Sequence, residues 1–336
     1  MSQPPNTSLD ALIDSLHASR AVSSDDVRIT PLSGGVSSDI FLVEDGPRRF
    51  AVKRALPQLK VKDAWFADTS RNRVEQAYLE YASRILPGSA PRILQSNPEA
   101  GWFAMEYLGD DFHTWKSLLM SGNADPRHAV RVGETLGRLH AASWGDPEIA
   151  SRFATLPNFH ALRIEPYLLT TAARVPAARA FLESEAQRLG ESRLALVHGD
   201  YSPKNLLVSP ERLVLIDAEC AWFGDPAFDT AFLLNHLHLK ALFHRAHPAP
   251  LMELVPAFWR SYVTALGRHA TPDLEVRTLR LLLGLMLARV HGKSPAEYLE
   301  SEDKERITRF VLRHLPDPPR LLSRFTEDWN ATLFHP

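Results

Sequence analysis

The chain has 336 residues, of which 45% are hydrophobic and 23% are charged, and its formal net charge is −2. This composition is that of a folded globular protein, and the length is too great for one small core, so we expect two lobes or domains. The near-neutral charge gives no electrostatic reason to expect a nucleic acid or an anionic membrane as a partner.

The single cysteine, Cys220, cannot form an internal disulfide, and the longest aliphatic run, residues 281–288, is far too short to span a membrane. The first apolar segment carries Asp10 and Asp14 and shows no cleavage pattern of a signal peptide. We therefore expect a soluble, cytoplasmic protein. The sequence does not indicate an oligomeric state.

The first hundred residues predict mainly strands. Residues 1–8 form a polar tail that we expect to be disordered, and residues 9–19 have the apolar spacing of a short helix. Strands are predicted at residues 27–32, 40–43, 50–55, 92–94 and 102–107, with an Asp45-Gly46 turn and a helix over residues 69–86. Gly109-Asp110-Asp111 is predicted to be a linker.

Beyond this linker the apolar spacing becomes helical. Helices are predicted at residues 115–121, 127–142, 176–189, 228–244, 251–266, 273–290 and 295–315, and short strands at residues 194–197, 206–208 and 213–216. The chain is thus predicted to be α+β and bilobal, with an antiparallel-sheet lobe over residues 1–108 and a mainly helical lobe over residues 109–336.

The most informative polar residues follow those short strands. His198-Gly199-Asp200 comes after the first strand, Asn205 precedes the second, and Asp217-Ala218-Glu219 follows the third. Phosphoryl transfer needs a carboxylate near the acceptor hydroxyl and hard oxygen ligands for magnesium. We therefore predict that Asp200 holds the hydroxyl and that Asn205, Asp217 and Glu219 bind Mg²⁺. The alternative for this stretch is a turn-rich structural hairpin.

A nucleotide site is predicted in the sheet lobe. Ser33-Gly34-Gly35-Val36-Ser37-Ser38 joins the first two strands, and its glycines would let the backbone approach phosphate while Ser37 and Ser38 add hydroxyl donors. Taken alone, this segment would be a plain hairpin turn. In Met105-Glu106-Tyr107-Leu108, backbone groups of Glu106 and Leu108 could pair with an adenine edge; an ordinary edge strand is the alternative.

Lys53 lies on a strand and shares a face with Ala51. A surface position is the alternative to a role at a phosphate, where such a lysine needs a helix glutamate to orient it. Glu75 heads an apolar stripe of the following helix and Glu80 heads a polar one, so we predict that Glu75 is the inward partner of Lys53.

Together these motifs resemble the aminoglycoside phosphotransferase and choline kinase group of small-molecule kinases, which share the protein-kinase fold. The residues that carry the resemblance are Gly34-Gly35-Val36-Ser37, Lys53, Glu75, Met105-Glu106, His198-Gly199-Asp200 to Asn205, Asp217-Ala218-Glu219 and Gly224-Asp225-Pro226-Ala227-Phe228-Asp229. The resemblance implies that Asp200 is the catalytic base, that Asn205 and Asp217 bind Mg²⁺, and that Lys53 holds the α- and β-phosphates of ATP.

Several positions depart from the common pattern or take supporting roles. Ser202-Pro203-Lys204 stands where many members have His-Pro-Gly, and Lys204 either reaches the transferring phosphate or is solvated. Asp217-Ala218-Glu219 is similar to the metal motif of methylthioribose kinases and choline kinases, which implies a second acidic metal ligand, Glu219. By the same resemblance, His198 braces its loop and Asp229 accepts backbone hydrogen bonds. Trp222 and Phe223 are expected to pack in the core.

The acceptor is a small molecule that the sequence does not identify. Residues 236–336 carry fourteen Lys and Arg against eleven Asp and Glu, which disfavours a polycationic aminoglycoside and favours a neutral or anionic hydroxyl compound. Arg289 and Lys293 could supply positive charge. The alternative is that Ser294-Pro295-Ala296-Glu297, a capping box, merely starts a helix there.

The predicted function is ATP-dependent transfer of the γ-phosphate to a hydroxyl of a small molecule such as a sugar or amino alcohol. A catalytically silent, nucleotide-binding scaffold on the same fold is the alternative. The presence of Lys53, Asp200 and Asp217 argues against that second reading.

Overall fold

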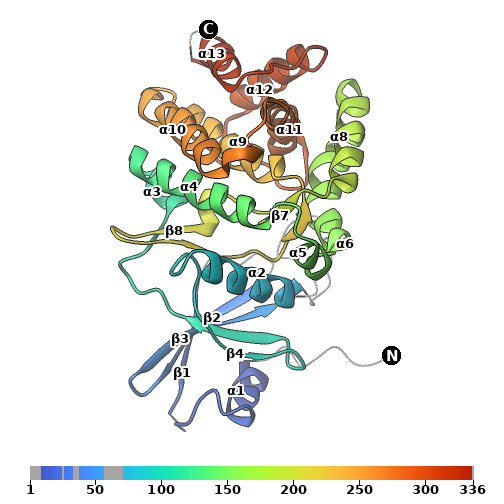
Figure 1. Cartoon of the computed structure of the whole chain (residues 1–336). Helices are drawn as coiled ribbons and strands as arrows, with labels where there is room; N and C mark the ends of the chain where they lie inside the picture. Colours follow the sequence, from blue (N-terminus) through green and yellow to red (C-terminus); the bar gives the residue numbers. More distant parts are fainter. Residues whose placement is uncertain (1–8, 25, 33–37, 57–70, 335–336) are drawn as a thin grey trace.

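The structure is a computed structural model that describes residues 9–24, 26–32, 38–56 and 71–334. The predicted tail (residues 1–8), the glycine-rich residues Gly34, Gly35 and Ser37, and the first two residues of the helix predicted from Thr69 lie outside these ranges. A sheet lobe occupies one end and a larger helical lobe the other (Figure 1).

The sheet lobe is a five-stranded antiparallel sheet in the order β1-β2-β3-β5-β4. Its elements are α1 (Leu9–Ala18), β1 (Arg28–Pro31), β2 (Ser38–Asp45), β3 (Arg48–Ala55), α2 (Arg71–Ile85), β4 (Ile93–Asn97) and β5 (Trp102–Glu106). The predicted Asp45-Gly46 turn joins β2 to β3, and the left-handed backbone of Gly46, with φ +59°, suits such a turn.

The two faces of this sheet alternate along each strand, as the period of two requires. Phe50 and Val52 of β3 pack in the cluster that also holds Leu12 and Leu16 of α1. Ala51, between them, packs instead in the large core that holds Tyr78 and Leu79 of α2. Lys53 is two residues after Ala51 and lies on the same face of β3, which is the face that packs against α2.

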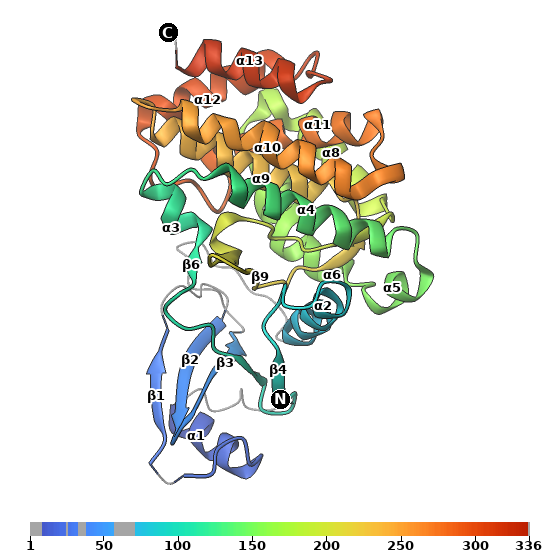
Figure 2. The same cartoon turned by 60° about the vertical axis from the view of Figure 1, so that its left-hand side comes forward.

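Helix α2 lies between the sheet and the helical lobe (Figures 1 and 2). Its apolar stripe is buried against both, because Leu79 belongs to a core that also holds Ala51 of β3 and Leu139 of α4. Tyr81 of the same helix donates a hydrogen bond of 2.9 Å from its hydroxyl to the carbonyl of Leu139. This bond fixes one side of the helix that carries Glu75. The position of α2 between the lobes is what brings residues of the sheet to the catalytic loops.

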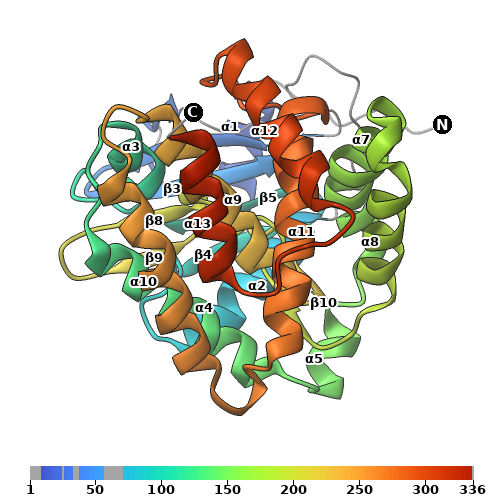
Figure 3. The ribbon, with the colours of Figure 1, turned by 90° about the horizontal axis from the view of Figure 1, so that it is seen from above.

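The helical lobe also contains two small antiparallel sheets. Its helices are α3 (Trp115–Met120), α4 (Pro126–Ser143), α5 (Pro147–Arg152), α6 (Leu156–Phe159), a π-helix (His160–Leu169), α7 (Thr170–Arg174), α8 (Arg179–Glu191), α9 (Ala227–Phe243), α10 (Ala249–Leu266), α11 (Pro272–His291), α12 (Ser301–His314) and α13 (Leu322–Leu333). Seen from above, α9 lies among α10, α11 and α13 (Figure 3). Almost all of α9 is buried, so it forms the centre of this lobe.

The small sheets lie where the two lobes meet (Figure 1). One pairs β7 (Ala195–Val197) with β10 (Trp222–Gly224), and the other has the order β6-β8-β9. The bounds of that second sheet are β6 (His113–Thr114), β8 (Leu206–Val208) and β9 (Leu213–Leu215). In the described part of the chain, no helix is long and apolar enough to cross a membrane.

One predicted helix starts in the wrong place. The capping box Ser294-Pro295-Ala296-Glu297 does not begin a helix, and α12 begins only at Ser301. The reason is that Arg289 competes for Ser294: its Nη1 donates to both the carbonyl and the hydroxyl of that serine. The hydroxyl is therefore engaged by a side chain from α11 rather than by the amide of Glu297.

Candidate active site

The catalytic loop between β7 and β8 is tightly held. Gly199 has φ +75°, and a Cβ there would lie 2.4 Å from the carbonyl oxygen of Cys220, so only glycine fits. Asp229, buried at the start of α9, accepts the amides of His198 at 2.7 Å and of Gly199 at 2.9 Å. These bonds confirm the role expected of Asp229 and leave Asp200, 4% exposed, at the end of a fixed loop.

His198 links the two functional loops. Its Nδ1 accepts the amide of Asp200 at 3.2 Å, so Nε2 carries the proton that is shared with the carbonyl of Ile216 at 3.2 Å. Burial lowers the pKa of His198, although Asp229 and Asp200 oppose the effect. A neutral, buried imidazole with both nitrogens engaged is a brace, as predicted, and not a base.

The second loop presents Asp217 in an uncommon backbone conformation. Asp217 has φ +64°, in the left-handed region that non-glycine residues rarely adopt. Its amide donates to Oε1 of Glu75 at 3.1 Å, and this bond holds the loop against α2. Burial alone would raise the pKa of Asp217, but Lys53 and Lys204 hold it well below its usual range.

Lys53 and Glu75 meet as the helix stripe predicts. Nζ of Lys53 lies 2.7 Å from Oε2 of Glu75 and 2.6 Å from Oδ1 of Asp217. Burial disfavours the ammonium, but the nearby carboxylates raise the pKa of Lys53 above its usual value. Glu80, the rejected candidate, points outward and pairs with Arg152 at 2.8 Å.

Lys204 and Asn205 lie on the turn that follows Asp200. Nζ of Lys204 is 3.0 Å from Oδ2 of Asp200 and 3.7 Å from Oδ2 of Asp217, so the ammonium lies between the two carboxylates although the side chain is 46% exposed. Of the two alternatives for Lys204, this geometry favours a place within the site. Asn205 donates from Nδ2 to the carbonyl of Asp200 at 3.0 Å, which turns its amide oxygen away from that carbonyl.

Two arginines that sequence reasoning missed bind the predicted acidic residues. Arg163, on the π-helix, places Nη2 3.0 Å from Oδ2 of Asp200 and also donates from Nε to the carbonyl of Gly199. Arg71, 1% exposed at the start of α2, donates from Nε to Oε2 of Glu219 at 2.8 Å. The sequence gives no signal for either contact. Arg71 falls within the helix predicted over residues 69–86, but its partner Glu219 is 148 residues away in the chain. Arg163 lies in a segment for which the sequence predicted no element.

The predicted ligands of a divalent metal are side-chain oxygens of two loops. Asn205 and Asp217 offer an amide oxygen and a carboxylate on adjacent loops, and such hard donors fit Mg²⁺. Glu219 already pairs with Arg71 and is 5% exposed. Within the described ranges, no three His, Cys, Asp or Glu side chains gather into a ready-made metal cluster. The residues fit a metal shared with a phosphate ligand better than one held by protein alone.

Among the predicted nucleotide contacts, Ser38, Glu106 and Leu108 lie in the described ranges. The buried hydroxyl of Ser38 has no hydrogen-bond partner among the described residues. The amide of Glu106 donates to the carbonyl of Arg92 at 2.9 Å, so that amide is used by the sheet and not by an adenine. The carboxylate of Glu106 pairs with Arg212 at 3.1 Å. The carbonyl of Glu106 and the amide of Leu108 remain the predicted adenine contacts.

Trp222 and Phe223 belong to the core, as expected. Trp222 is 1% exposed and stacks on Phe159, with ring centroids 4.8 Å apart and planes 22° apart. Phe223 is 3% exposed. Both residues lie on β10, which pairs with β7, so their packing supports the strand that leads into the catalytic loop.

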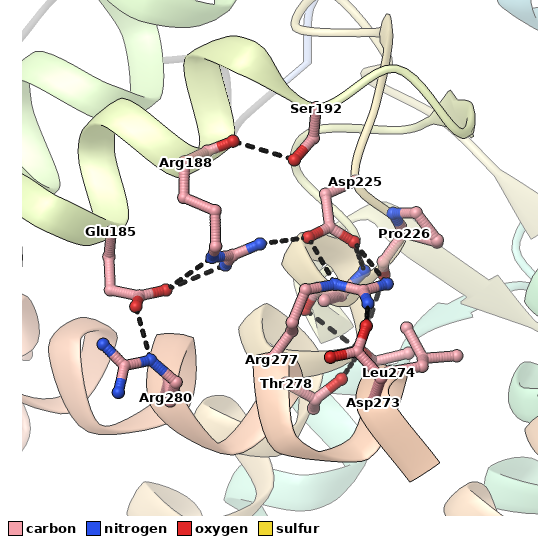
Figure 4. Close-up of polar contacts among 12 residues, drawn as sticks. Glu185, Arg188, Ser192, Asp225, Pro226, Asp273, Leu274, Arg277, Thr278 and Arg280 are labelled. Atoms are coloured by element: carbon pink, nitrogen blue, oxygen red, sulfur yellow. Dashed lines mark hydrogen bonds and ion pairs between the residues drawn. The ribbon is translucent and has the colours of Figure 1, made fainter. Parts of the chain in front are cut away.

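An ion network fixes the start of α9, which carries Asp229 (Figure 4). Asp225 is completely buried and accepts the amide of Ala227 at 3.0 Å. Its carboxylate also contacts Arg188 of α8 and lies 3.0 Å from Nε of Arg277 of α11. The network thus ties α8, α9 and α11 together behind the catalytic loop.

Asp225→Asn is expected to lower the free energy of unfolding by about 3 kcal/mol, because it leaves two partly buried guanidinium groups without their shared carboxylate. Urea denaturation measures this change. Asp273→Asn is a matched control in the same network, since Asp273 also pairs with Arg277 but its side chain is 73% exposed. That control should cost less than about 1 kcal/mol. Equal effects of the two variants would contradict the importance of the buried network.

Most of the chain matches the model of a known protein family. The family model described as the phosphotransferase enzyme family matches residues 28–270. The chain therefore belongs to the phosphotransferase enzyme family.

Two curated relatives indicate which kind of phosphotransferase the chain resembles. A methylthioribose kinase of Yersinia pseudotuberculosis is 28% identical over 330 residues, covering 82% of this chain and 81% of that protein. A methylthioribose kinase of Pectobacterium carotovorum is 27% identical over 229 residues, covering 60% of this chain and 57% of the relative. The chain is a small-molecule kinase, and a kinase of this class uses ATP together with a divalent metal ion.

Solved structures share the fold. A choline kinase from Cryptosporidium parvum Iowa II has a TM-score of 0.57 at 15% identity, covering 98% of this chain and 100% of that one. An amicoumacin kinase in complex with AMP-PNP and Ca²⁺ has a TM-score of 0.57 at 13% identity, covering 92% of this chain and 95% of that one. This likeness confirms the predicted bilobal, protein-kinase-like α+β fold.

Proposed function

We propose that this protein transfers the γ-phosphate of ATP to a hydroxyl group of a small-molecule acceptor. One observation carries the proposal: Lys53, Asp217, Lys204 and Asp200 form a continuous chain of ion pairs, each 3.7 Å or shorter, that runs from the sheet to the catalytic loop. Alternating charges in this order suit a site that binds a polyphosphate at one end and a hydroxyl at the other.

The acceptor hydroxyl is proposed to lie at Asp200. Its oxygen forms a bond to the γ-phosphorus as the bond from that phosphorus to the β–γ bridging oxygen breaks, ADP leaves, and the hydroxyl proton passes to Asp200. Arg163 keeps one carboxylate oxygen in place at 3.0 Å. Lys204, which touches the same oxygen, is positioned to follow the transferring phosphoryl group.

The nucleotide is proposed to bind between the sheet and α2. Lys53, oriented by Glu75, holds the α- and β-phosphates. The glycine-rich segment contacts the phosphates through Gly34, Gly35, Ser37 and Ser38. The carbonyl of Glu106 and the amide of Leu108 pair with the adenine. Lys53 supports this arrangement best, since an ammonium 2% exposed and bound by two carboxylates is fixed in direction.

The divalent ion is proposed to be Mg²⁺, held by Asn205 and Asp217, with Glu219 as a further acidic ligand. When bound, it would neutralise the charge that develops between the β- and γ-phosphates. Arg71 holds Glu219 toward the loop and thereby sets the direction of its carboxylate. We also propose that the lobes divide between residues 108 and 109 and that the protein is cytoplasmic, with no nucleic acid or membrane partner.

Methylthioribose is the first acceptor to test, because curated relatives are named for it. Melting temperature with and without Mg-ATP should reveal nucleotide binding, and ADP release across a panel of hydroxyl compounds should reveal the acceptor. Binding of Mg-ATP with no transfer to any member would favour the silent scaffold instead. Against the scaffold, Lys53, Asp200 and Asp217 are all present and in mutual contact through Lys204.

A further inference from the structure

His236 and Lys240 of α9 and Arg289 of α11 form a group of basic side chains in the region where α9 packs against α11. The two helices are drawn in Figure 3. Lys240 of α9 is 1% exposed, which is rare for a lysine that has no acidic partner. Its Nζ lies 3.5 Å from Nδ1 of His236 and 5.6 Å from the ring centroid of Tyr298, and both partners are uncharged when His236 is neutral. In the part of the chain that the structure describes, no carboxylate pairs with Lys240.

Arg289 of α11 adds a second positive charge to the group. Its Nη1 is bound to Ser294, a neutral residue, and its Nε is buried without a hydrogen-bond partner among the described residues. The buried hydroxyl of Tyr298 likewise has no partner there. The neighbouring Lys293 differs, because Glu165 neutralises it at 3.0 Å. The buried Lys240 and the half-buried Arg289 thus form a positive centre with donors to spare.

The electrostatic consequences agree with this geometry. Burial, then Arg289 and Lys116 of α3, lower the pKa of Lys240 to about 7. Burial, Lys240 and Arg289 lower the pKa of His236 far below its usual value, and Lys204 and Lys116 add to the effect. Such crowding of cations is unfavourable in the empty protein and would be relieved by a bound anion.

The same face of α9 leads from this centre to the catalytic base. Phe232, His236 and Lys240 follow one another at intervals of four residues, or about one helical turn each. The guanidinium of Arg163 stands 5.7 Å from the ring centroid of Phe232 and contacts Asp200 at 3.0 Å. An acceptor with its hydroxyl at Asp200 would therefore extend along α9 toward Lys240.

We propose that the acceptor is an anionic hydroxyl compound whose carboxylate or phosphate ester binds Lys240 and Arg289 while its hydroxyl lies at Asp200. The proposal rests on the phosphotransferase function proposed above and narrows its substrate class. Lys240 and Arg289 select the acceptor by charge. A polycationic aminoglycoside would be repelled by this centre, and neutral methylthioribose would leave both cations unpaired.

The test compares pairs of acceptors that differ by one anionic group, namely ribose with ribose 5-phosphate and glycerol with glycerate. Methylthioribose is assayed as a further neutral compound. ADP release gives kcat/KM for each compound. The anionic member of a pair should be preferred by about 10-fold or more, and Lys240→Met or Arg289→Gln should remove that preference by raising KM about 10- to 100-fold. KM for ATP should be unchanged. Lys304→Met, on α12, is the lysine-to-methionine control and should keep the preference.

A binding experiment without catalysis tests this inference independently of the proposed function. The melting temperature of the protein with Mg-ADP is recorded against glycerate, ribose 5-phosphate and inorganic phosphate, with no turnover needed. Stabilisation of the wild type that is lost in Lys240→Met supports the anion site even if no compound is phosphorylated. The inference is overturned by a preference for the neutral members, by equal loss on neutral and anionic acceptors, or by identical anion stabilisation in the wild type and both variants. Separate ribose 5-phosphate and glycerate results show whether the site takes a phosphate or a carboxylate.

Discussion

Asp200→Asn is expected to lower kcat by about 10²- to 10⁴-fold, the range that a positioned general base contributes. The substitution keeps the shape of the side chain but removes the carboxylate that is proposed to accept the hydroxyl proton. The backbone carbonyl that binds Asn205 at 3.0 Å is unaffected, so the metal-binding turn should keep its form. Affinity for Mg-ATP, measured by calorimetry, should change less than about threefold because the nucleotide is proposed to bind on the far side of Lys204 from Asp200.

Asp273→Asn serves again as the control for the same chemical change at an exposed position. It should retain wild-type kcat. If Asp200→Asn also kept near wild-type turnover in the same assay, Asp200 would not be the base. A large fall in ATP affinity together with kcat would instead mean that Asp200 acts through the nucleotide or metal.

Lys53→Ala is expected to cut kcat/KM for ATP by about 10²- to 10³-fold, as for the loss of one oriented donor to developing charge. The structure also predicts a loss of stability, because Glu75 and Asp217 both lie within 3 Å of the ammonium and would be left facing each other in a buried site. Steady-state kinetics and melting temperature without ligand measure the two effects.

The double variant Lys53→Ala/Glu75→Gln separates the loss of activity from the loss of stability. Removing one of the two buried carboxylates should restore much of the melting temperature, whereas the activity should stay low because no ammonium faces the phosphates. Recovery of activity along with stability would show that Lys53 acts only as a structural counter-ion. Glu80→Gln, on the outer side of the same helix, is the matched control and should leave both quantities nearly unchanged.

Local patterns were sufficient to predict the sheet lobe and the pair that it contributes. Alternation along β3 placed Lys53 on the face of Ala51, and the stripe headed by Glu75 placed that residue inward. The pair then followed from the packing of α2 on the sheet. The strands before Asp200 and Asp217 were recognisable because short apolar runs end in polar residues.

Contacts made across the fold by single long side chains could not be predicted in this way. Arg163 lies on a π-helix that contains Pro166, and neither the five-residue hydrogen-bond spacing nor a proline gives the 3.6-residue pattern of a helix. The capping box at Ser294 failed because Arg289, five residues earlier at the end of α11, donates to that serine. Lys240 gave no signal at all, since its burial depends on how α9 packs against α11 and not on its neighbours in sequence.

Phosphorus NMR of a reaction with ATP, Mg²⁺ and the acceptor panel is the most direct test that the chain moves a phosphoryl group to a hydroxyl. We expect a phosphate monoester signal that grows in equal amount to ADP with the wild type and is absent with Asp200→Asn. Formation of inorganic phosphate alone would contradict the proposed transfer. An ester signal of equal size with both proteins would contradict the role of Asp200 as the base.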